Sequence, residues 1–403
     1  MAQLAEKSKC TGCAACYNKC SVGALEMISD ETGFLFPVID QSKCVECGAC
    51  EKACPVLDKV TVQPRKPNAY IVQHKDDTVR LQSTSGGAYT AIATQILARG
   101  GVVFGAAFQE DYYVRHTEVQ TVDQLSIFRS SKYVQSEIGD SFRRAKKYLQ
   151  EGRWVCFSGT PCQIQGLKKY LGKHYDKLIT VDFMCRAVPS PKVFHKYLEY
   201  QKRNYPNFQR LVFRDKGLGY SYSTMALYDH KDSQKCVYRG GSESDQWLRL
   251  FLKGYCNRPS CYLCPFQTGD RVSDYTLWDC WGTENYAPEL NDNKGTTNVI
   301  VWTQLGHEIF EEACNHLKVK EIGIDAIDAS LERLSALSQP EYDKAQFYKD
   351  VDEMEAAAFF NKYVPMTPKI CLKKFGRYML HKFHLHDLLR RSVHKIRERN
   401  KKH

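Results

Sequence analysis

The sequence predicts a chain of mixed α+β class in two parts, a small cysteine-rich domain followed by a larger mixed α/β domain. Three observations support this prediction. The first 54 of the 403 residues contain eight cysteines, and strand and helix patterns alternate from residue 69 onward. The composition, 43% hydrophobic and 26% charged, is that of an ordinary globular protein of two or three domains.

The eight cysteines form two copies of the spacing C-x2-C-x2-C-x3-C. They are Cys10, Cys13, Cys16 and Cys20, then Cys44, Cys47, Cys50 and Cys54. This pattern is typical of a bacterial-type ferredoxin domain that binds two 4Fe–4S clusters, in which the fourth cysteine of each run binds the other cluster. The alternatives are structural zinc, which usually needs four ligands in two pairs, and a disulfide framework, which is typical of small secreted chains. The spacing favours iron–sulfur clusters and therefore single-electron transfer.

The chain divides into four predicted segments. They are 1–57, the ferredoxin-type domain with a short strand pair near 33–38; 58–68, a linker; 69–345, the larger domain; and 346–403, a basic helical tail. In the larger domain we expect strands at 69–72, 101–108, 154–157, 178–183, 211–213, 223–227 and 298–303. We expect helices at 88–98, 140–150, 161–171 and 306–316. The alternation predicts some parallel strand pairing.

Four further cysteines follow predicted strands or form a pair. Cys162 lies in the first turn of a predicted helix, where the helix dipole favours a thiolate. Cys185 follows the next strand, so both could face one crevice at the carboxyl edge of the sheet. Cys261 and Cys264 have the spacing of metal ligands and would complete a set of four. The alternatives are buried free thiols and a zinc-bound or inactive C-x2-C pair.

A loop of small residues, Ser85-Gly86-Gly87, precedes the helix predicted at 88–98. Free N–H groups at a helix start suit a phosphate or pyrophosphate, although a plain helix cap fits the same residues. Neither G-x-G-x-x-G nor G-x4-G-K-[ST] occurs in the chain, so a standard dinucleotide or P-loop site is not supported. The segment 271–282 reads either as a strand that ends at a site or as a half-buried edge strand.

Together these segments resemble the beta-subunit family of coenzyme F420 hydrogenases and dehydrogenases. The matching segments are 85–87, 131–136, 159–163, Cys185 with 188–191, 213–216, 258–264 and 271–282. The resemblance covers residues 1 to about 285, with weaker support to about 340. The chain departs from the family pattern in two places: it has Cys185-Arg186-Ala187 where Cys-His-Gly is common, and Asp279-Cys280-Trp281-Gly282 where Asp-Phe-Trp-Gly is common. These departures bear on the substrate more than on the cofactors.

The resemblance implies FAD beside a third 4Fe–4S cluster in the larger domain. It implies Cys162, Cys185, Cys261 and Cys264 as ligands of that cluster. For FAD it implies a site formed by Ser85, Gly86, Gly87, Ser131, Lys132, Tyr133, Thr160 and Pro161. Lys132 and Arg186 become candidate catalytic residues that stabilise reduced, anionic flavin or an acidic substrate. A flavin would reconcile single-electron clusters with a substrate that exchanges hydride.

Two functions remain open at this stage. The first is an iron–sulfur flavoprotein oxidoreductase that exchanges hydride with coenzyme F420, a nicotinamide or another small molecule, including one used in polysaccharide synthesis. The second is an electron-transfer subunit without a substrate site of its own, which serves a partner enzyme. In either case we expect a redox partner protein or a small-molecule hydride donor or acceptor.

The net charge of +11 is concentrated in the tail. Residues 366–403 contain 12 Lys or Arg and 2 Asp or Glu, whereas the rest of the chain has 45 basic and 44 acidic residues. A nucleic-acid binder with a basic body is therefore not expected. Apolar residues of the tail, including Leu372, Phe375 and Met379 and then Leu389, Val393 and Ile396, fall near a 3/4 spacing among the basic ones, with a break near 384–387.

The tail could therefore lie on an anionic membrane surface, dock a partner or be a solvated helix. No apolar run approaches 18 residues and no signal-like segment precedes Cys10, so we expect a cytoplasmic protein. Any peripheral membrane contact would then be made at the inner face of the membrane.

Overall fold

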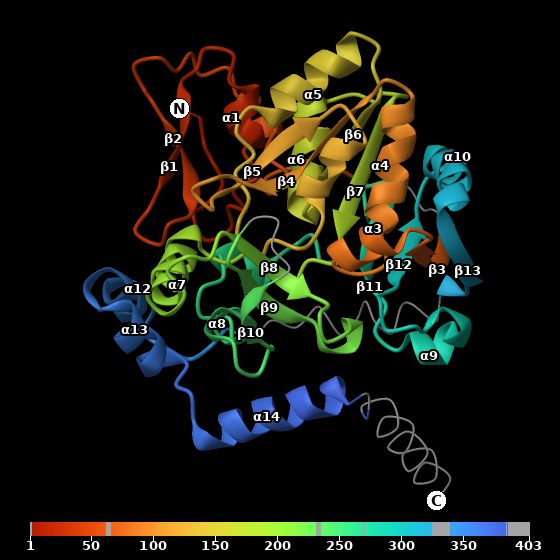
Figure 1. Cartoon of the computed structure of the whole chain (residues 1–403). Helices are drawn as coiled ribbons and strands as arrows, with labels where there is room; N and C mark the ends of the chain where they lie inside the picture. The colour runs from red at the N-terminus through yellow and green to blue at the C-terminus, as the bar shows by residue number, and fades with distance from the viewer. Residues whose placement is uncertain are drawn as a thin grey trace, which may run out of the picture.

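The N-terminal part of the chain forms a small unit of one hairpin and two short helices (Figure 1). The computed structural model describes residues 2–61, 66–230, 235–267, 269, 271–324, 339–383 and 385. The elements of the unit are α1 (Ala15–Lys19), β1 (Leu25–Ser29), β2 (Leu35–Ile39) and α2 (Ala49–Lys52). β1 and β2 pair antiparallel, with Leu25 opposite Ile39. The unit is too small for a large apolar core, and it packs against the larger domain through α1.

An eight-stranded mixed sheet forms the centre of the larger domain. Its strands are β3 (Asn68–His74), β4 (Val102–Phe108), β5 (Val114–Val119), β6 (Val155–Gly159), β7 (Leu178–Phe183), β11 (Tyr275–Asp279), β12 (Thr297–Val301) and β13 (Leu317–Ile322). The order across the sheet is β13-β3-β12-β11-β7-β6-β4-β5. β4, β6, β7 and β11 are parallel, and the outer strands pair antiparallel. The predicted fold class is therefore confirmed, parallel pairing included.

Helices cover both faces of this sheet. They are α3 (Asp77–Gln82), α4 (Ala88–Ala98), α5 (Ser141–Gln150), α6 (Pro161–Leu171), α9 (Thr283–Tyr286) and α10 (Gln304–Ala313). Neighbouring residues of one strand point to opposite faces. In β6, Cys156 packs with α4 and α10, whereas Val155 and Phe157 pack with α5, α6 and α1. The N-terminal unit thus lies on the α5–α6 side of the sheet.

A second, three-stranded antiparallel sheet lies below the first (Figure 1). It consists of β8 (Arg210–Asp215), β9 (Thr224–Tyr228) and β10 (Cys236–Gly240). The helices around it are α7 (Pro191–Asn204), α8 (Gln246–Leu252), α12 (Lys344–Glu353) and α13 (Ala356–Tyr363). Phe347 of α12 and Phe359 of α13 are buried in the same core as Trp247 of α8. Five 3-10 helices connect other elements: η1 (Asp123–Phe128), η2 (Tyr220–Tyr222), η3 (Pro259–Leu263), η4 (Pro288–Leu290) and η5 (Cys314–His316).

The last described helix, α14 (Pro368–Lys382), extends along the edge of the molecule (Figure 1). Residues 344–363 of the C-terminal region are packed into the body, and the exposed part begins near Pro365. The predicted break near 384–387 and the apolar residues Leu389, Val393 and Ile396 lie outside the described residues, apart from Leu385. Among the described helices, none is long and apolar enough to cross a bilayer.

Candidate functional site

Four cysteines of the N-terminal unit converge on one small void. Cys10, Cys13 and Cys16 of the first run line it together with Cys54, the last cysteine of the second run. Burial raises the pKa of the Cys16 thiol to about 12, and the neighbouring thiols of Cys10 and Cys54 add to the rise. A bound metal would hold such thiols in their thiolate form. The remaining cysteines of the two runs are Cys20, Cys44, Cys47 and Cys50.

The chain turns sharply between Cys10 and Cys13, and a glycine permits the turn. Gly12 has φ +69°, a left-handed conformation that favours glycine. A Cβ on Gly12 would stand 2.6 Å from Gln135 Nε2 and 2.7 Å from Arg258 Nη1. The loop that carries the first two thiols therefore lies directly against residues of the larger domain.

The structure also brings together the four cysteines of the larger domain. Cys162 lies in the first turn of α6, Cys185 follows β7, Cys261 lies in η3 and Cys264 follows it. Burial raises the pKa of Cys162 to about 11 and of Cys261 to about 12. The Cys185 thiol has its pKa raised well above its usual value by burial and by the neighbouring thiols of Cys261, Cys162 and Cys264.

Among the described residues, no three His, Cys, Asp or Glu side chains are placed to share one metal ion. The four thiolates of a cubane bind four separate irons, so they stand further apart than the ligands of a single ion such as zinc.

Local sequence explains why Cys162 lies where it does. Thr160 is the N-cap of α6 and forms a capping box with Gln163, and Pro161 occupies the first helical position. The Thr160 hydroxyl lies 3.1 Å from Cys162 Sγ. The carboxyl ends of the parallel strands β6 and β7 thus deliver Cys162 and Cys185 to the same edge of the sheet.

The two cysteine sets are neighbours. Cys13 Sγ would lie 3.0 Å from a Cβ on Gly166 of α6, so only glycine leaves room for α1 at this point. Burial raises the pKa of Cys13 well above its usual value, and the Cys162 thiol is close enough to contribute. Cys162 therefore stands between the N-terminal set and Cys185.

Arg258 joins the same two sets and is fully buried. Its Nε donates to the Cys10 carbonyl at 2.7 Å, and its Nη2 donates to Cys10 Sγ at 3.8 Å. Its charge also lowers the pKa of the Cys162 and Cys261 thiols against the larger effect of burial. One buried cation thus faces both candidate cluster sites.

A cavity of about 750 Å³ opens beside Cys185, at the carboxyl edge of the sheet. Its size suits a cofactor or a small ligand. Five basic side chains and one carboxylate line it: Arg129, Lys132, Arg186, Arg214, Arg377 and Asp279. This excess of positive charge suits an anionic ligand.

Several buried polar atoms in the cavity wall have no hydrogen-bond partner among the described residues. They are Arg129 Nε, Ser130 Oγ, Arg186 Nε, Ser221 Oγ and Trp278 Nε1. Buried polar atoms are nearly always paired, so unpaired ones in one wall leave hydrogen-bonding capacity beside the cavity. Aromatic side chains including Tyr133, Phe183 and Trp281 supply flat apolar surface beside them.

Most of the predicted flavin-site residues lie on this cavity. Those on its wall are Ser85, Gly87, Ser131, Lys132, Tyr133 and Thr160, and the candidate catalytic residue Arg186 also lines it. Gly86 and Pro161 are buried behind the wall. The N–H of Gly86 donates to Thr297 Oγ1 at 2.7 Å and is therefore not available to a phosphate. The loop reaches the cavity through the residues on either side of Gly86.

Lys132 has an unusual environment for a lysine. Its ammonium donates to the carbonyls of Ile127 and Arg129 at 2.9 and 3.0 Å, and the residue lines the cavity. Burial lowers its pKa to about 7. The lysine can thus gain or lose a proton near neutral pH, and a bound anion would favour its charged form.

Sequence reasoning missed an ion pair on the opposite wall. Arg214 Nη1 lies 3.0 Å from Asp279 Oδ2, and its guanidinium lies 5.0 Å from the centre of the Trp281 ring. Tyr220 also stacks on Trp281, with ring centres 4.9 Å apart. The segments 213–216 and 271–282 contain these residues, but only folding pairs Arg214 with Asp279. Arg377 was also missed, because it reaches the cavity from α14.

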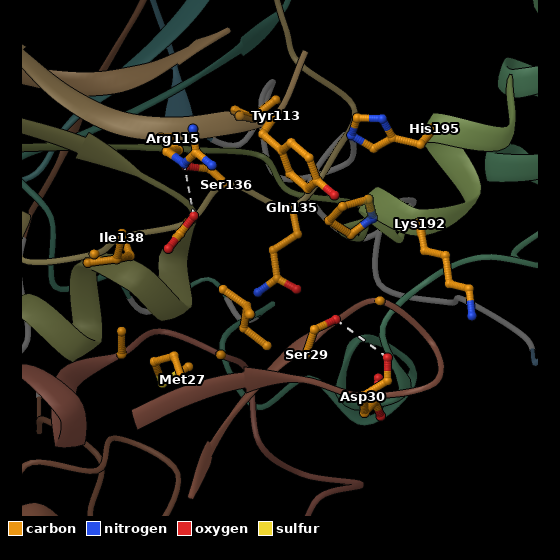
Figure 2. Close-up of a pocket in the computed structure, with 18 of the residues that line it drawn as sticks. Met27, Ser29, Asp30, Tyr113, Arg115, Gln135, Ser136, Ile138, Lys192 and His195 are labelled. Carbon is orange, nitrogen blue, oxygen red and sulfur yellow. Dashed lines mark hydrogen bonds and ion pairs between the residues drawn. The ribbon is translucent and has the colours of Figure 1, made fainter. Parts of the chain in front are cut away.

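A second cavity, of about 850 Å³, separates the β1–β2 hairpin from α7 and β5. Figure 2 shows Gln135 pointing into it and Arg115 paired with a carboxylate, which is Glu137 at 3.1 Å. Tyr113 packs on His195, with ring centres 4.2 Å apart. Both acidic and basic side chains line this second cavity, and none of the cysteines Cys162, Cys185, Cys261 and Cys264 lines it.

Two family models match the parts of the chain that contain these cysteines. Residues 9–57 match a family model described as a 4Fe-4S dicluster domain. Residues 152–326 match the model that describes the C terminus of the coenzyme F420 hydrogenase/dehydrogenase beta subunit, and this match spans Cys162 to Cys264. A search of curated proteins found no match.

Among solved structures, the chain is similar to one from the F420-reducing [NiFe] hydrogenase complex of Methanosarcina barkeri. The identity is 16%, the TM-score is 0.47, and the match covers 68% of this chain and 92% of that one. The two family models thus agree with the predicted resemblance: residues 152–326 are similar to the C terminus of the coenzyme F420 hydrogenase/dehydrogenase beta subunit, and a 4Fe-4S dicluster domain precedes them.

Proposed function

We propose that this protein is an iron–sulfur flavoprotein oxidoreductase. It exchanges single electrons with a redox partner and hydride with a small molecule, and coenzyme F420 is the first candidate for that molecule. Iron–sulfur clusters carry single electrons and a flavin accepts one or two, so the two groups together would supply the conversion between these modes.

The residues present fit these groups. The two cysteine runs would hold two 4Fe–4S clusters, and Cys162, Cys185, Cys261 and Cys264 would hold a third. FAD would bind in the 750 Å³ cavity, which Arg129 and Arg186 line. The arginines there keep their charge at all working pH values and suit phosphate oxygens.

The observation that carries the proposal is the position of Cys185. Its thiol lies with the other three cysteines of the larger domain, and the same residue lines the cavity. Cys162 of that set adjoins Cys13 of the N-terminal unit. The chain therefore offers an unbroken series of sites from the N-terminal cysteines to the cavity wall.

The side chains around the cavity have distinct roles in this proposal. Lys132 can hold a proton beside the ligand, and a bound anion favours this charged form. Arg186 follows Cys185 directly and brings a fixed positive charge next to both the third cysteine set and the cavity. Arg214, held by Asp279, stabilises Trp281 as a flat wall of the cavity. Together these groups favour a ligand that becomes more negative on reduction.

Anaerobic reconstitution of the full chain with iron, sulfide and FAD tests the cofactor content. We expect about 12 irons, four per cubane, and one FAD per chain. A product with about eight irons and no flavin would contradict the proposed arrangement in the larger domain.

A second experiment separates the enzyme from an electron-transfer subunit that has no substrate site. Reduced coenzyme F420, NADH and NADPH are each added to the reconstituted protein in the absence of any partner protein. We expect one of them to bleach the flavin absorbance, as followed after mixing in a stopped-flow instrument. If none does so while dithionite bleaches it fully, the subunit without a substrate site is the correct function.

A further inference from the structure

Helix α14 contacts the body along one side only. Its inward side chains are spaced three or four residues apart, so they share one face of the helix. Arg377 Nη1 pairs with the buried Glu243 at 2.9 Å, and the His381 ring stacks on Tyr222 with centres 4.7 Å apart. Lys374 lies over the ring of Tyr238 on β10. These contacts determine which face of α14 points outward.

The outward face of α14 is apolar along its middle. Leu372 is 72% exposed and Phe375 is 61% exposed. Phe383, just beyond the end of the helix, is 56% exposed and continues the same line. In Figure 1 this helix lies at the outer edge of the molecule, and no other described element covers its far side. Large apolar side chains grouped in this way mark a contact surface.

Basic side chains flank the apolar line. Lys369 and Lys373 lie along one side of it and Lys382 along the other, and all three are exposed. The segment 366–382 has five Lys or Arg and no Asp or Glu. An apolar stripe bordered by lysines is typical of helices that lie in the plane of a membrane interface.

We propose that α14 docks this protein on an anionic phospholipid surface. Leu372, Phe375 and Phe383 enter the boundary between headgroups and acyl chains, and the flanking lysines contact the lipid phosphates. Charge complementarity selects this occupant, because a second copy of the chain on the same face would bring two sets of lysines together. The docking does not depend on the proposed redox function.

Docking would also position the 750 Å³ cavity. Arg377 belongs to α14 and lines the cavity, so one cavity wall would lie about one helix diameter, roughly 10 Å, from the lipid. The redox site would therefore work close to the membrane surface.

The test uses the full chain and two kinds of vesicle, one of phosphatidylcholine alone and one of equal parts phosphatidylcholine and phosphatidylglycerol. We expect co-sedimentation with the anionic vesicles only, and less of it at high salt. The triple variant Lys369→Gln/Lys373→Gln/Lys382→Gln should bind about 100-fold more weakly, since each basic group near an anionic surface contributes roughly fivefold. The variant Leu372→Ser/Phe375→Ser should also lose most of its binding.

Matched controls carry the same changes elsewhere on the surface. They are Lys147→Gln/Lys173→Gln/Lys202→Gln for charge and Val122→Ser/Val319→Ser for apolar exposure. Both controls should bind as the unmodified chain does. Unchanged binding by either α14 variant, or equal binding to both vesicles, overturns the proposal. Self-association that the Leu372→Ser/Phe375→Ser variant abolishes, without any vesicle binding, would assign the surface to a second copy instead.

Discussion

Arg258 of the larger domain donates a hydrogen bond from Nε to the backbone carbonyl of Cys10, at 2.7 Å, in the N-terminal unit. The same guanidinium donates to the Leu35 carbonyl at 3.0 Å and to Gln135 Oε1 at 2.8 Å. It also lies over the Phe36 ring at 4.2 Å. A single buried side chain therefore fixes the two parts of the chain against each other where their cysteine sets meet.

Replacement of Arg258 by methionine should loosen this junction. The variant removes a buried charge and leaves three partly buried acceptors without this donor, so we expect the free energy of unfolding to fall by about 3 kcal/mol. Loss of a positive charge beside Cys10 should also make the reduction potential of a nearby cluster more negative, on the order of 60 mV, because reduction adds negative charge there. Urea unfolding and an EPR-monitored redox titration measure the two effects.

Arg249→Met is the matched control for Arg258. Arg249 is also buried and donates to two backbone carbonyls, those of Val364 and Pro365, but it lies in α8. This variant should lose stability while the reduction potentials stay unchanged. Equal shifts of potential in both variants would show that general loosening, and not the charge of Arg258, sets the potential.

Cys185→Ser should remove one cluster and leave the others. We expect reconstituted protein to lose about four of its irons, since three thiolates hold a cubane poorly. FAD affinity should fall as well, because Cys185 lines the cavity. Iron analysis and flavin fluorescence measure these results. Cys314→Ser, at a half-buried cysteine on η5, should retain full iron content.

FAD affinity should depend on pH through Lys132. Burial lowers the pKa of this lysine to about 7 in the free protein, and a bound anion raises it. The charged form is therefore lost as pH rises through 7, and affinity should fall about tenfold from pH 6 to pH 8.5. Burial lowers the pKa of His116 on the same wall to about 4, so it stays neutral in this range.

Lys132→Gln should remove most of this pH dependence. Fluorescence titration of FAD against the variant and the unmodified chain, at both pH values, compares them directly. An unchanged slope in the variant would assign the titration to another group. The cavity arginines keep their charge throughout the range and should not contribute.

Gly86→Ala should destabilise the wall of the cavity. A Cβ at this position would stand 2.4 Å from the Val72 carbonyl oxygen and 2.8 Å from the Thr297 backbone nitrogen. Since both neighbours are strand backbone, we expect a loss of about 1–3 kcal/mol, measured by thermal or urea unfolding. Gly323→Ala, where the added Cβ meets nothing within 4 Å, should change stability by less than about 0.5 kcal/mol. Equal losses in the two variants would refute the steric explanation.

The periodicity of the sequence predicted most of the central sheet and its helices. Apolar runs such as 101–108 and 178–183 became β4 and β7, because buried parallel strands are apolar on both faces. The edge strands β5 and β13 were not predicted. Val114–Val119 and Leu317–Ile322 have charged or polar side chains along an edge that is half in water, so their patterns resemble loops.

The sequence by itself determined the chemistry of the two N-terminal cysteine runs, because the short spacings within each run bring three thiolates close together. Only the tertiary structure decided that Arg258 contacts Cys10, that Arg214 pairs with Asp279, and that α14 contributes Arg377 to the cavity. These residues are separated by tens to hundreds of positions. Their meeting depends on strand order and on burial of apolar faces, which no local spacing specifies.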